Sequence, residues 1–230
     1  MTVEILFPEV CGLCGDIGNV RYLKKSLPDA IFKETGLTSE PYFSRNQVDI
    51  VYMGCMAEKT QIRLIDKLMP LRDRIDKMID DGTIFIFTGN AADIMFENIT
   101  MTNGKTYDGL EIFPLKSKYQ TLRYQDVTVG EHKDMELIGE RFQTWFSYGN
   151  NEDCGFLNVK KGVGINPEST IEGVRRNNFF GTSLLGPFLV LNPHFTEYII
   201  KQAGVVGEEI AFKEVGLKAY HNNLGIFKNK

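Results

Sequence analysis

The stretch Ile84-Phe85-Ile86-Phe87-Thr88-Gly89-Asn90-Ala91-Ala92-Asp93 decides the fold of this chain. An apolar, aromatic-rich run ends at Thr88, turns at Gly89 and continues into a short helix-forming segment through Phe96. This order is typical of a nucleophile elbow, the sharp strand-to-helix turn that lifts one side chain to the rim of an α/β sheet. The lifted group would be the Thr88 hydroxyl, which is a poor nucleophile unless a base removes its proton. The sequence therefore predicts a catalytic framework without its usual chemistry.

Strand and helix patterns alternate around this elbow. Buried-strand runs cover residues 3–7, 48–53 and 83–87, and helix-type spacing of apolar residues covers 16–27 and 57–81. Pro70 removes an intrahelical donor and predicts a break in the second helical run. This β-α-β alternation predicts a mainly parallel sheet with helices on both faces, in a flavodoxin-like three-layer α/β sandwich.

The second half of the chain has a different pattern. Asn103-Gly104 predicts a hairpin, and strand-like runs follow at 121–129, 137–138, 144–148 and 156–163. The chain then returns to a terminal helix at 193–203. Because no Pro/Ser-rich linker separates the halves, we interpret the second half as an antiparallel extension within one domain, residues 1–203. Residues 204–230 are polar and are expected to form a peripheral arm.

Composition excludes several classes of function. The 230 residues carry a formal charge of -4, so no basic surface of the kind that nucleic-acid binding requires is expected. The chain contains no apolar run of about 18 residues, so no membrane span is predicted. The N-terminal residues lack the charged region of a signal peptide, so no signal peptide is predicted. The 4 cysteines fit reduced thiols better than a disulfide framework, which favours a cytoplasmic location.

Several motifs share their order and spacing with one family. They are Gly15-Asp16-Ile17-Gly18-Asn19-Val20, Asp49-Ile50-Val51-Tyr52-Met53-Gly54, the elbow, Thr106-Tyr107-Asp108-Gly109-Leu110, and Phe180-Gly181-Thr182-Ser183-Leu184-Leu185-Gly186-Pro187. Over about residues 2 to 203, the chain resembles the class I glutamine amidotransferases of the cobyric acid synthase type. Among these it is most similar to the glutaminase subunits of lipid II isoglutaminyl synthase, which serve cell wall biosynthesis.

The resemblance implies glutamine hydrolysis by an elbow cysteine and a histidine, with ammonia passed to a Mur-ligase-like synthetase partner. Position by position, the cysteine falls on Thr88, the histidine on Leu185 and the Gly-rich oxyanion loop on Gly54-Cys55-Met56. Leucine cannot accept a proton, so ordinary glutaminase activity is not expected. We predict a non-catalytic protein that binds a partner, or itself as a dimer, without a cofactor.

Candidate ligand-binding residues follow the strand ends, where open α/β sheets place their sites. They are Asp16, Asn19, Gly54, Gly89 and Asn90. Asp16 also stands where a residue would cap the first helix, and capping alone would explain it. The sequence leaves the ligand role and the capping role equally open.

The cysteines supply the alternatives. Cys55 could act as a migrated nucleophile, or Thr88 as an altered one, against the plainer interpretation that Cys55 fills space in a degenerate site. Cys11 and Cys14 form a Cys-x-x-Cys that should reach the same sheet edge as Cys55, so a small-molecule or metal site is a further alternative. Reduced structural thiols remain the plainer reading, since a metal site would lack its fourth ligand.

The histidines and one aromatic segment offer little chemistry. His132 is expected in a solvated turn, His194 facing solvent at a helix start, and His221 in the arm. The segment 141–146 (Arg-Phe-Gln-Thr-Trp-Phe) replaces a stretch that lies near the glutamine pocket in the family. An ordinary antiparallel core strand accounts for it better than a narrowed pocket does.

Overall fold

The structure is a computed structural model that describes residues 1–207 and 209–229. Its α-helices are α1 (Ile17–Ser26), α2 (Glu58–Leu68), α3 (Arg72–Asp80), α4 (Phe188–Leu191), α5 (Pro193–Gln202) and α6 (Lys213–Asn229). Its strands are β1 (Thr2–Leu6), β2 (Ile31–Thr35), β3 (Ile50–Met53), β4 (Ile84–Thr88), β5 (Phe96–Thr100), β6 (Thr106–Asp108), β7 (Phe113–His132), β8 (Met135–Gly149), β9 (Leu157–Lys161), β10 (Ile171–Glu172), β11 (Val174–Arg176) and β12 (Phe179–Thr182).

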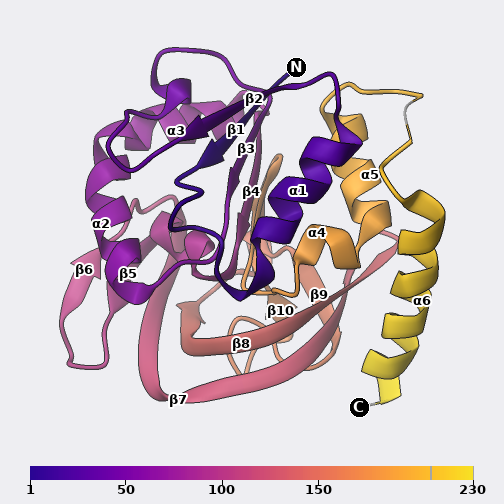
Figure 1. The fold of residues 1–230 in the computed structure, drawn as a ribbon. Helices are drawn as coiled ribbons and strands as arrows, with labels where there is room; N and C mark the ends of the chain where they lie inside the picture. Colours follow the sequence, from indigo (N-terminus) through magenta and orange to yellow (C-terminus); the bar gives the residue numbers. More distant parts are fainter. Residues whose placement is uncertain (208, 230) are drawn as a thin grey trace.

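A six-stranded sheet in the order β11-β12-β4-β3-β1-β2 forms the first half of the molecule. All neighbours in it are parallel except β11, which runs antiparallel to β12. Helices α2 and α3 cover one face and α1, α4 and α5 the other, which Figure 1 shows as three layers. The predicted flavodoxin-like class is confirmed.

The predicted elements of this half lie close to the observed ones, except that strands β2 and β5 were not predicted. The break at Pro70 is confirmed, because a 3₁₀ turn over Met69–Leu71 separates α2 from α3. Strand β2 was not predicted, because it is an edge strand with mostly exposed residues and no apolar run. The segment after the elbow is a 3₁₀ helix over Gly89–Met95, followed by the unpredicted strand β5.

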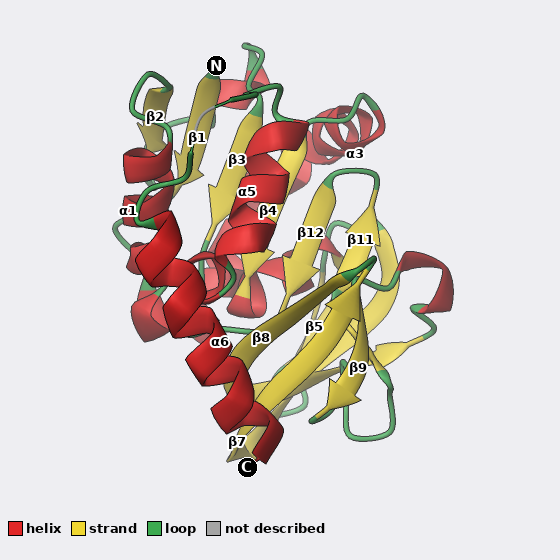
Figure 2. Ribbon diagram, turned by 90° about the vertical axis from the view of Figure 1, so that its right-hand side faces the viewer, coloured by secondary structure: helices red, strands yellow, loops and turns green. Residues whose placement is uncertain are grey.

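The second sheet has the order β10-β9-β7-β5-β6, with β8 paired to β7. The runs predicted separately at 121–129, 137–138 and 144–148 belong to one long hairpin, β7 and β8, which Figure 2 shows crossing the lower half of the molecule. Its ladder is interrupted between Tyr119 and Tyr124. The Asn103-Gly104 hairpin is confirmed, since it joins β5 to β6 with Gly104 at φ 82°.

The C-terminal residues do not form the expected arm. Helix α6 lies along the β7–β8 hairpin (Figure 2) and buries Tyr220 and Phe227 against Val127, Val129 and Ile138. Helix α6 was not predicted, because its apolar residues do not follow one face: Tyr220 and Phe227 are buried, whereas Val215 and Ile226 are exposed. No helix in the described part of the chain combines the length and hydropathy that a membrane span requires.

Candidate functional site

The loops after β1, β3 and β4 meet at one edge of the parallel sheet. The backbone N–H of Leu13 donates to the carbonyl of Cys55 at 3.0 Å, and the N–H of Cys55 donates to Asp16 Oδ2 at 2.7 Å. Gly54 permits this approach, because a Cβ there would stand 2.7 Å from the Cys11 carbonyl oxygen. The three loops that the sequence singled out therefore build one crevice.

Thr88 does not stand at the rim of this crevice. It ends β4 with extended backbone (φ -114°, ψ 151°) and is fully buried. Its hydroxyl donates to Asp16 Oδ2 at 2.7 Å and lies 3.0 Å from the Tyr52 hydroxyl. The prediction that the elbow lifts the Thr88 hydroxyl to the rim is wrong, because Thr88 still belongs to β4 and its side chain points into the buried space around Asp16 and Tyr52.

Gly89 is the residue of the turn, with φ 62°. A Cβ on Gly89 would lie 2.6 Å from Cys55 Cβ, 2.9 Å from Cys55 Sγ and 3.1 Å from Leu185 Cδ2. A side chain at this position would therefore point between Cys55 and Leu185. Glycine leaves that space to the Cys55 thiol.

Asp16 lies at the centre of a buried polar cluster that we call the elbow cluster, consisting of Asp16, Asn19, Tyr52 and Thr88. Asn19 Nδ2 donates to Asp16 Oδ1 at 3.1 Å and to the Tyr52 hydroxyl at 2.9 Å. Burial raises the pKa of Asp16 to about 6, although hydrogen bonds from the Cys55 N–H, Thr88 and Asn19 oppose the shift. The carboxylate makes no capping hydrogen bond to α1, so the capping prediction is wrong.

The side chains of Asn19 and Asn90 also form hydrogen bonds with other parts of the protein. Asn19 Oδ1 accepts the N–H of Leu189 at 2.8 Å, which ties α1 to α4. Asn90 Oδ1 accepts the Met56 N–H at 3.0 Å, and its Nδ2 donates to the Met56 carbonyl at 3.0 Å and to the Tyr119 hydroxyl at 2.9 Å. These two predicted ligand residues face protein atoms.

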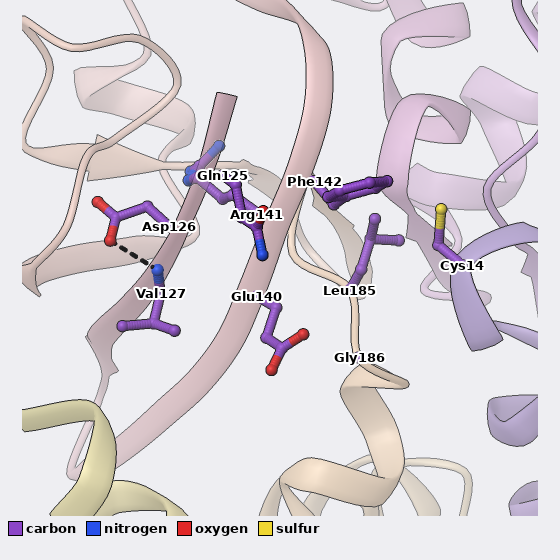
Figure 3. A pocket seen from close by; sticks show the side chains of 9 residues that line it. All are labelled: Cys14, Gln125, Asp126, Val127, Glu140, Arg141, Phe142, Leu185 and Gly186. Carbon is purple, nitrogen blue, oxygen red and sulfur yellow. Dashed lines mark hydrogen bonds between the residues drawn. The ribbon is translucent and has the colours of Figure 1, made fainter. Parts of the chain in front are cut away.

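Two adjacent cavities open beside the elbow, of about 520 Å³ and 410 Å³, and Cys14 and Phe142 line both. Leu185 lines the larger one, and Figure 3 shows it between Phe142 and Cys14. The smaller one lies against Cys55, Tyr119 and Trp145 among others. The sequence did not identify Tyr119, whose role depends on a register within β7 that no local pattern reports.

Cys14 interacts with Cys55, a contact that the Cys-x-x-Cys spacing does not predict. Cys14 is exposed, and a hydrogen bond from the Cys55 thiol lowers the pKa of Cys14 to about 7 despite opposing burial. The same hydrogen bond, followed by burial, raises the pKa of Cys55. Cys11 is buried, and burial raises its pKa to about 12. Within the described residues, no group of three or more His, Cys, Asp or Glu side chains is placed to hold a metal ion.

The histidines lie elsewhere in the described structure, and none lines either cavity. His132 is not in a solvated turn: it packs among Phe156, Phe180 and Phe195, and burial lowers its pKa to about 4. His194 does not face solvent freely, because its Nε2 lies 2.9 Å from the Glu136 carbonyl oxygen. His221 lies in α6 beside Tyr220.

The segment 141–146 is a core strand, as the plainer interpretation predicted. Arg141, Gln143 and Trp145 are buried in β8, while Phe142 is 41% exposed and borders both cavities. Arg141 Nη2 lies 3.4 Å from Glu172 Oε1, an ion-pair distance without hydrogen-bond geometry, and both side chains are fully buried.

Comparisons with known proteins agree with this geometry at the level of the fold. No protein-family model matches the chain. Over 211 residues it is 22% identical to the lipid II isoglutaminyl synthase (glutamine-hydrolyzing) subunit GatD of Staphylococcus aureus, covering 88% of this chain and 84% of the relative. The subunit of the same name from Streptococcus pneumoniae is 24% identical over 216 residues, covering 88% and 80%.

Two solved structures of glutamine amidotransferase-type proteins superpose on the chain. A glutamine amidotransferase crystal structure superposes with a TM-score of 0.59 at 15% identity, covering 88% of this chain and 99% of that one. PurLQS from Thermotoga maritima superposes with a TM-score of 0.54 at 13% identity, covering 97% and 98%. The chain therefore has a glutamine amidotransferase-like fold.

Proposed function

We propose that this chain, built on a glutamine amidotransferase-like domain, is non-catalytic and acts by binding a synthetase subunit of the Mur-ligase type. One observation carries the proposal. Gly89 is the residue of the elbow turn, and the space its side chain would take is filled by Cys55 and Leu185. We infer that Gly89, rather than Thr88, stands at the nucleophile's place and that Leu185 stands at the histidine's place.

This arrangement leaves the crevice without the groups of a cysteine hydrolase. The turn residue has no side chain, and leucine cannot accept or donate a proton. Losing either the nucleophile or the base typically removes most of the acceleration of such a site. Thr88 is no substitute, because its hydroxyl is buried and bonded to Asp16.

The alternative of altered chemistry at Cys55 has less support. The Cys55 thiol is buried, and its hydrogen bond to Cys14 and its burial raise its pKa, which disfavours the thiolate that would attack an amide. The partner in the proposal comes from the relatives. Both curated relatives are subunits of a lipid II isoglutaminyl synthase, and the chain covers 84% and 80% of their lengths.

Ammonia release from glutamine tests the catalytic half of the proposal. We expect the purified chain, alone and with the synthetase, to release no more ammonia than buffer does. If the wild-type chain releases ammonia and the Cys55→Ala variant does not, the altered chemistry at Cys55 is established instead.

A rebuilt site provides the positive control. The triple variant Gly89→Cys, Cys55→Gly, Leu185→His restores a thiol and an imidazole on facing positions and removes the side chain that a Cβ at 89 would meet. Elbow nucleophiles stand on such strained turns. We expect measurable ammonia release from this variant and none from the matched variant Thr88→Cys, Leu185→His. Ammonia release from the Thr88→Cys, Leu185→His variant and none from the triple variant would show that Thr88, and not Gly89, stands at the nucleophile's place.

Co-purification tests the binding half. The chain is expressed with a tag beside the Mur-ligase-like synthetase of the same cell, and the mass of the eluted complex is measured by sedimentation. We expect a stable complex of the two chains. A chain that sediments alone at micromolar concentration, or only as its own dimer, would contradict the choice of partner.

A further inference from the structure

Two thiols from different loops meet at the mouth of the crevice. We propose that Cys14 and Cys55 form a reactive dithiol, which low-molecular-weight disulfides oxidise to an intramolecular Cys14–Cys55 disulfide. This inference goes beyond the proposed function and does not depend on it, because it needs neither glutamine nor a partner.

The backbone brings the two cysteines together. The N–H of Leu13 donates to the Cys55 carbonyl at 3.0 Å, which fixes the turn at Leu13–Gly15 against the loop after β3. Cys14 and Cys55 line the same 410 Å³ cavity, so both thiols border one space. Cys14 has φ 55°, a left-handed conformation that non-glycine residues rarely adopt. Such local strain is typical of functional positions.

The Cys-x-x-Cys spacing would instead pair Cys14 with Cys11. Cys11 is 3% exposed and belongs to the apolar core on the face of α2 and α3. Unlike Cys55, it is not among the residues that line either cavity. The Cys-x-x-Cys motif therefore contains Cys14, but the partner of Cys14 is Cys55 and not Cys11.

The two thiols are suited to different steps of one exchange. Cys14 is exposed, and the Cys55 hydrogen bond lowers its pKa to about 7, so it is the attacking thiol. Its thiolate attacks a disulfide RS–SR, forms a Cys14–SR mixed disulfide and expels RS⁻. The mixed disulfide removes the Cys14 hydrogen bond that is the largest cause of the raised Cys55 pKa. Cys55 then gives up its proton and attacks the Cys14 sulfur, which breaks the Cys14–SR bond and expels the second RS⁻.

The exchange is balanced. Two electrons pass from the protein dithiol to the small disulfide, and the two thiol protons end on two RSH molecules. The new bond would tie the turn at Leu13–Gly15 covalently to the loop after β3, beside the point where Gly89 and Leu185 face each other. Oxidation would therefore change the wall that both cavities share.

Peptide mapping by mass spectrometry after treatment with oxidised glutathione tests the proposal on the wild-type chain, without any variant. We expect a peptide cross-link joining Cys14 to Cys55 and the loss of two hydrogens from the intact mass. A Cys11–Cys14 cross-link, a stable glutathione adduct on Cys14, or no modification would each overturn the proposal.

Variants assign the two roles. Cys55→Ala should accumulate the glutathione adduct on Cys14, because no resolving thiol remains, whereas Cys14→Ser should stay unmodified at Cys55. Cys154→Ser is the matched control, since Cys154 is partly exposed and not among the residues that line either cavity, and it should cross-link like the wild type. At pH 7, Cys14 should alkylate roughly fivefold faster than Cys154, whose pKa burial raises. Equal rates would contradict the attacking role of Cys14.

Discussion

The elbow cluster and a second buried cluster show two ways of keeping a carboxyl group inside this protein. The second, which we call the junction cluster, consists of Arg141, Glu172 and Thr182 and lies where the two sheets meet. Each cluster has a fully buried acid whose pKa burial raises, and each acid accepts a hydrogen bond from a threonine hydroxyl. The two threonines, Thr88 and Thr182, are even register partners on the adjacent strands β4 and β12.

The clusters differ in what balances the charge. Arg141 stands 3.4 Å from Glu172, whereas the hydrogen-bonding partners of Asp16 are neutral: the Cys55 N–H, Thr88 and Asn19. Burial raises the pKa of both acids, but the Arg141 charge opposes the rise at Glu172, whereas no cation in the described part of the chain opposes it at Asp16. The comparison indicates that neutral hydrogen bonds hold the acid of the elbow cluster, while a buried charge pair lies where the two sheets meet.

Arg141→Ala should produce the largest effect, because it leaves Glu172 buried without its cation. We expect a loss of about 3 to 5 kcal/mol in the free energy of unfolding, the usual cost of breaking a buried pair. Urea unfolding at pH 7 measures it. Lys24→Ala removes a cation from an exposed pair with Glu34 and should cost less than about 1 kcal/mol. Similar losses in the two variants would mean that the junction pair contributes no more than a surface pair.

The pH dependence of stability should reveal the protonation of Asp16. Its folded-state pKa of about 6 lies above the unfolded value near 4. The folded chain thus holds an extra proton between these values. The resulting stabilisation is fully present below about pH 4 and is lost as the pH rises through 6, with a total on the order of 3 kcal/mol.

Asp16→Asn removes that titration and should flatten this part of the curve of unfolding free energy against pH. The difference in slope between wild type and variant, from pH 4 to 7, is the measurement. Asp29→Asn, at an exposed position, is the control for losing a carboxylate. An unchanged slope in Asp16→Asn would mean that Asp16 stays ionised, and the contrast between the clusters would fail.

The parallel sheet was predictable because its strands are buried on both faces and therefore read as apolar runs. Ile84–Thr88 is wholly buried and was found, while the edge strand Ile31–Thr35 is mostly exposed and was missed. The long hairpin appeared as fragments because residues of β7 alternate between buried and exposed, which is a weaker signal than an apolar run. His132 was misplaced because a polar turn pattern cannot report the phenylalanines that surround it.

The sequence predicted which loops form the candidate site, but not how the side chains are arranged within it. Strand ends located the three loops correctly, since parallel strands deliver their carboxyl ends to one edge. The turn at Gly89 was predicted, but the direction of the Thr88 side chain was not, because it depends on hydrogen bonds to Asp16 and Tyr52 from other parts of the chain. The pairing of Cys14 with Cys55, rather than with Cys11, likewise depends on a contact between distant loops.

The smallest effect should come from Thr88→Val, and its register partner supplies the sharpest comparison. At pH 5 Asp16 is mostly protonated, so the lost hydrogen bond joins two neutral groups and should cost about 1 kcal/mol. Thr182→Val removes a hydrogen bond to the paired Glu172 and also leaves the Leu184 N–H without its acceptor, so it should cost about 2 to 3 kcal/mol. Valine keeps the shape of threonine, which limits packing changes in both variants. Parallel urea unfolding at pH 5 gives the two values, and equal costs would show that the Arg141 charge beside Glu172 and the Leu184 N–H add nothing to the cost of losing the Thr182 hydroxyl.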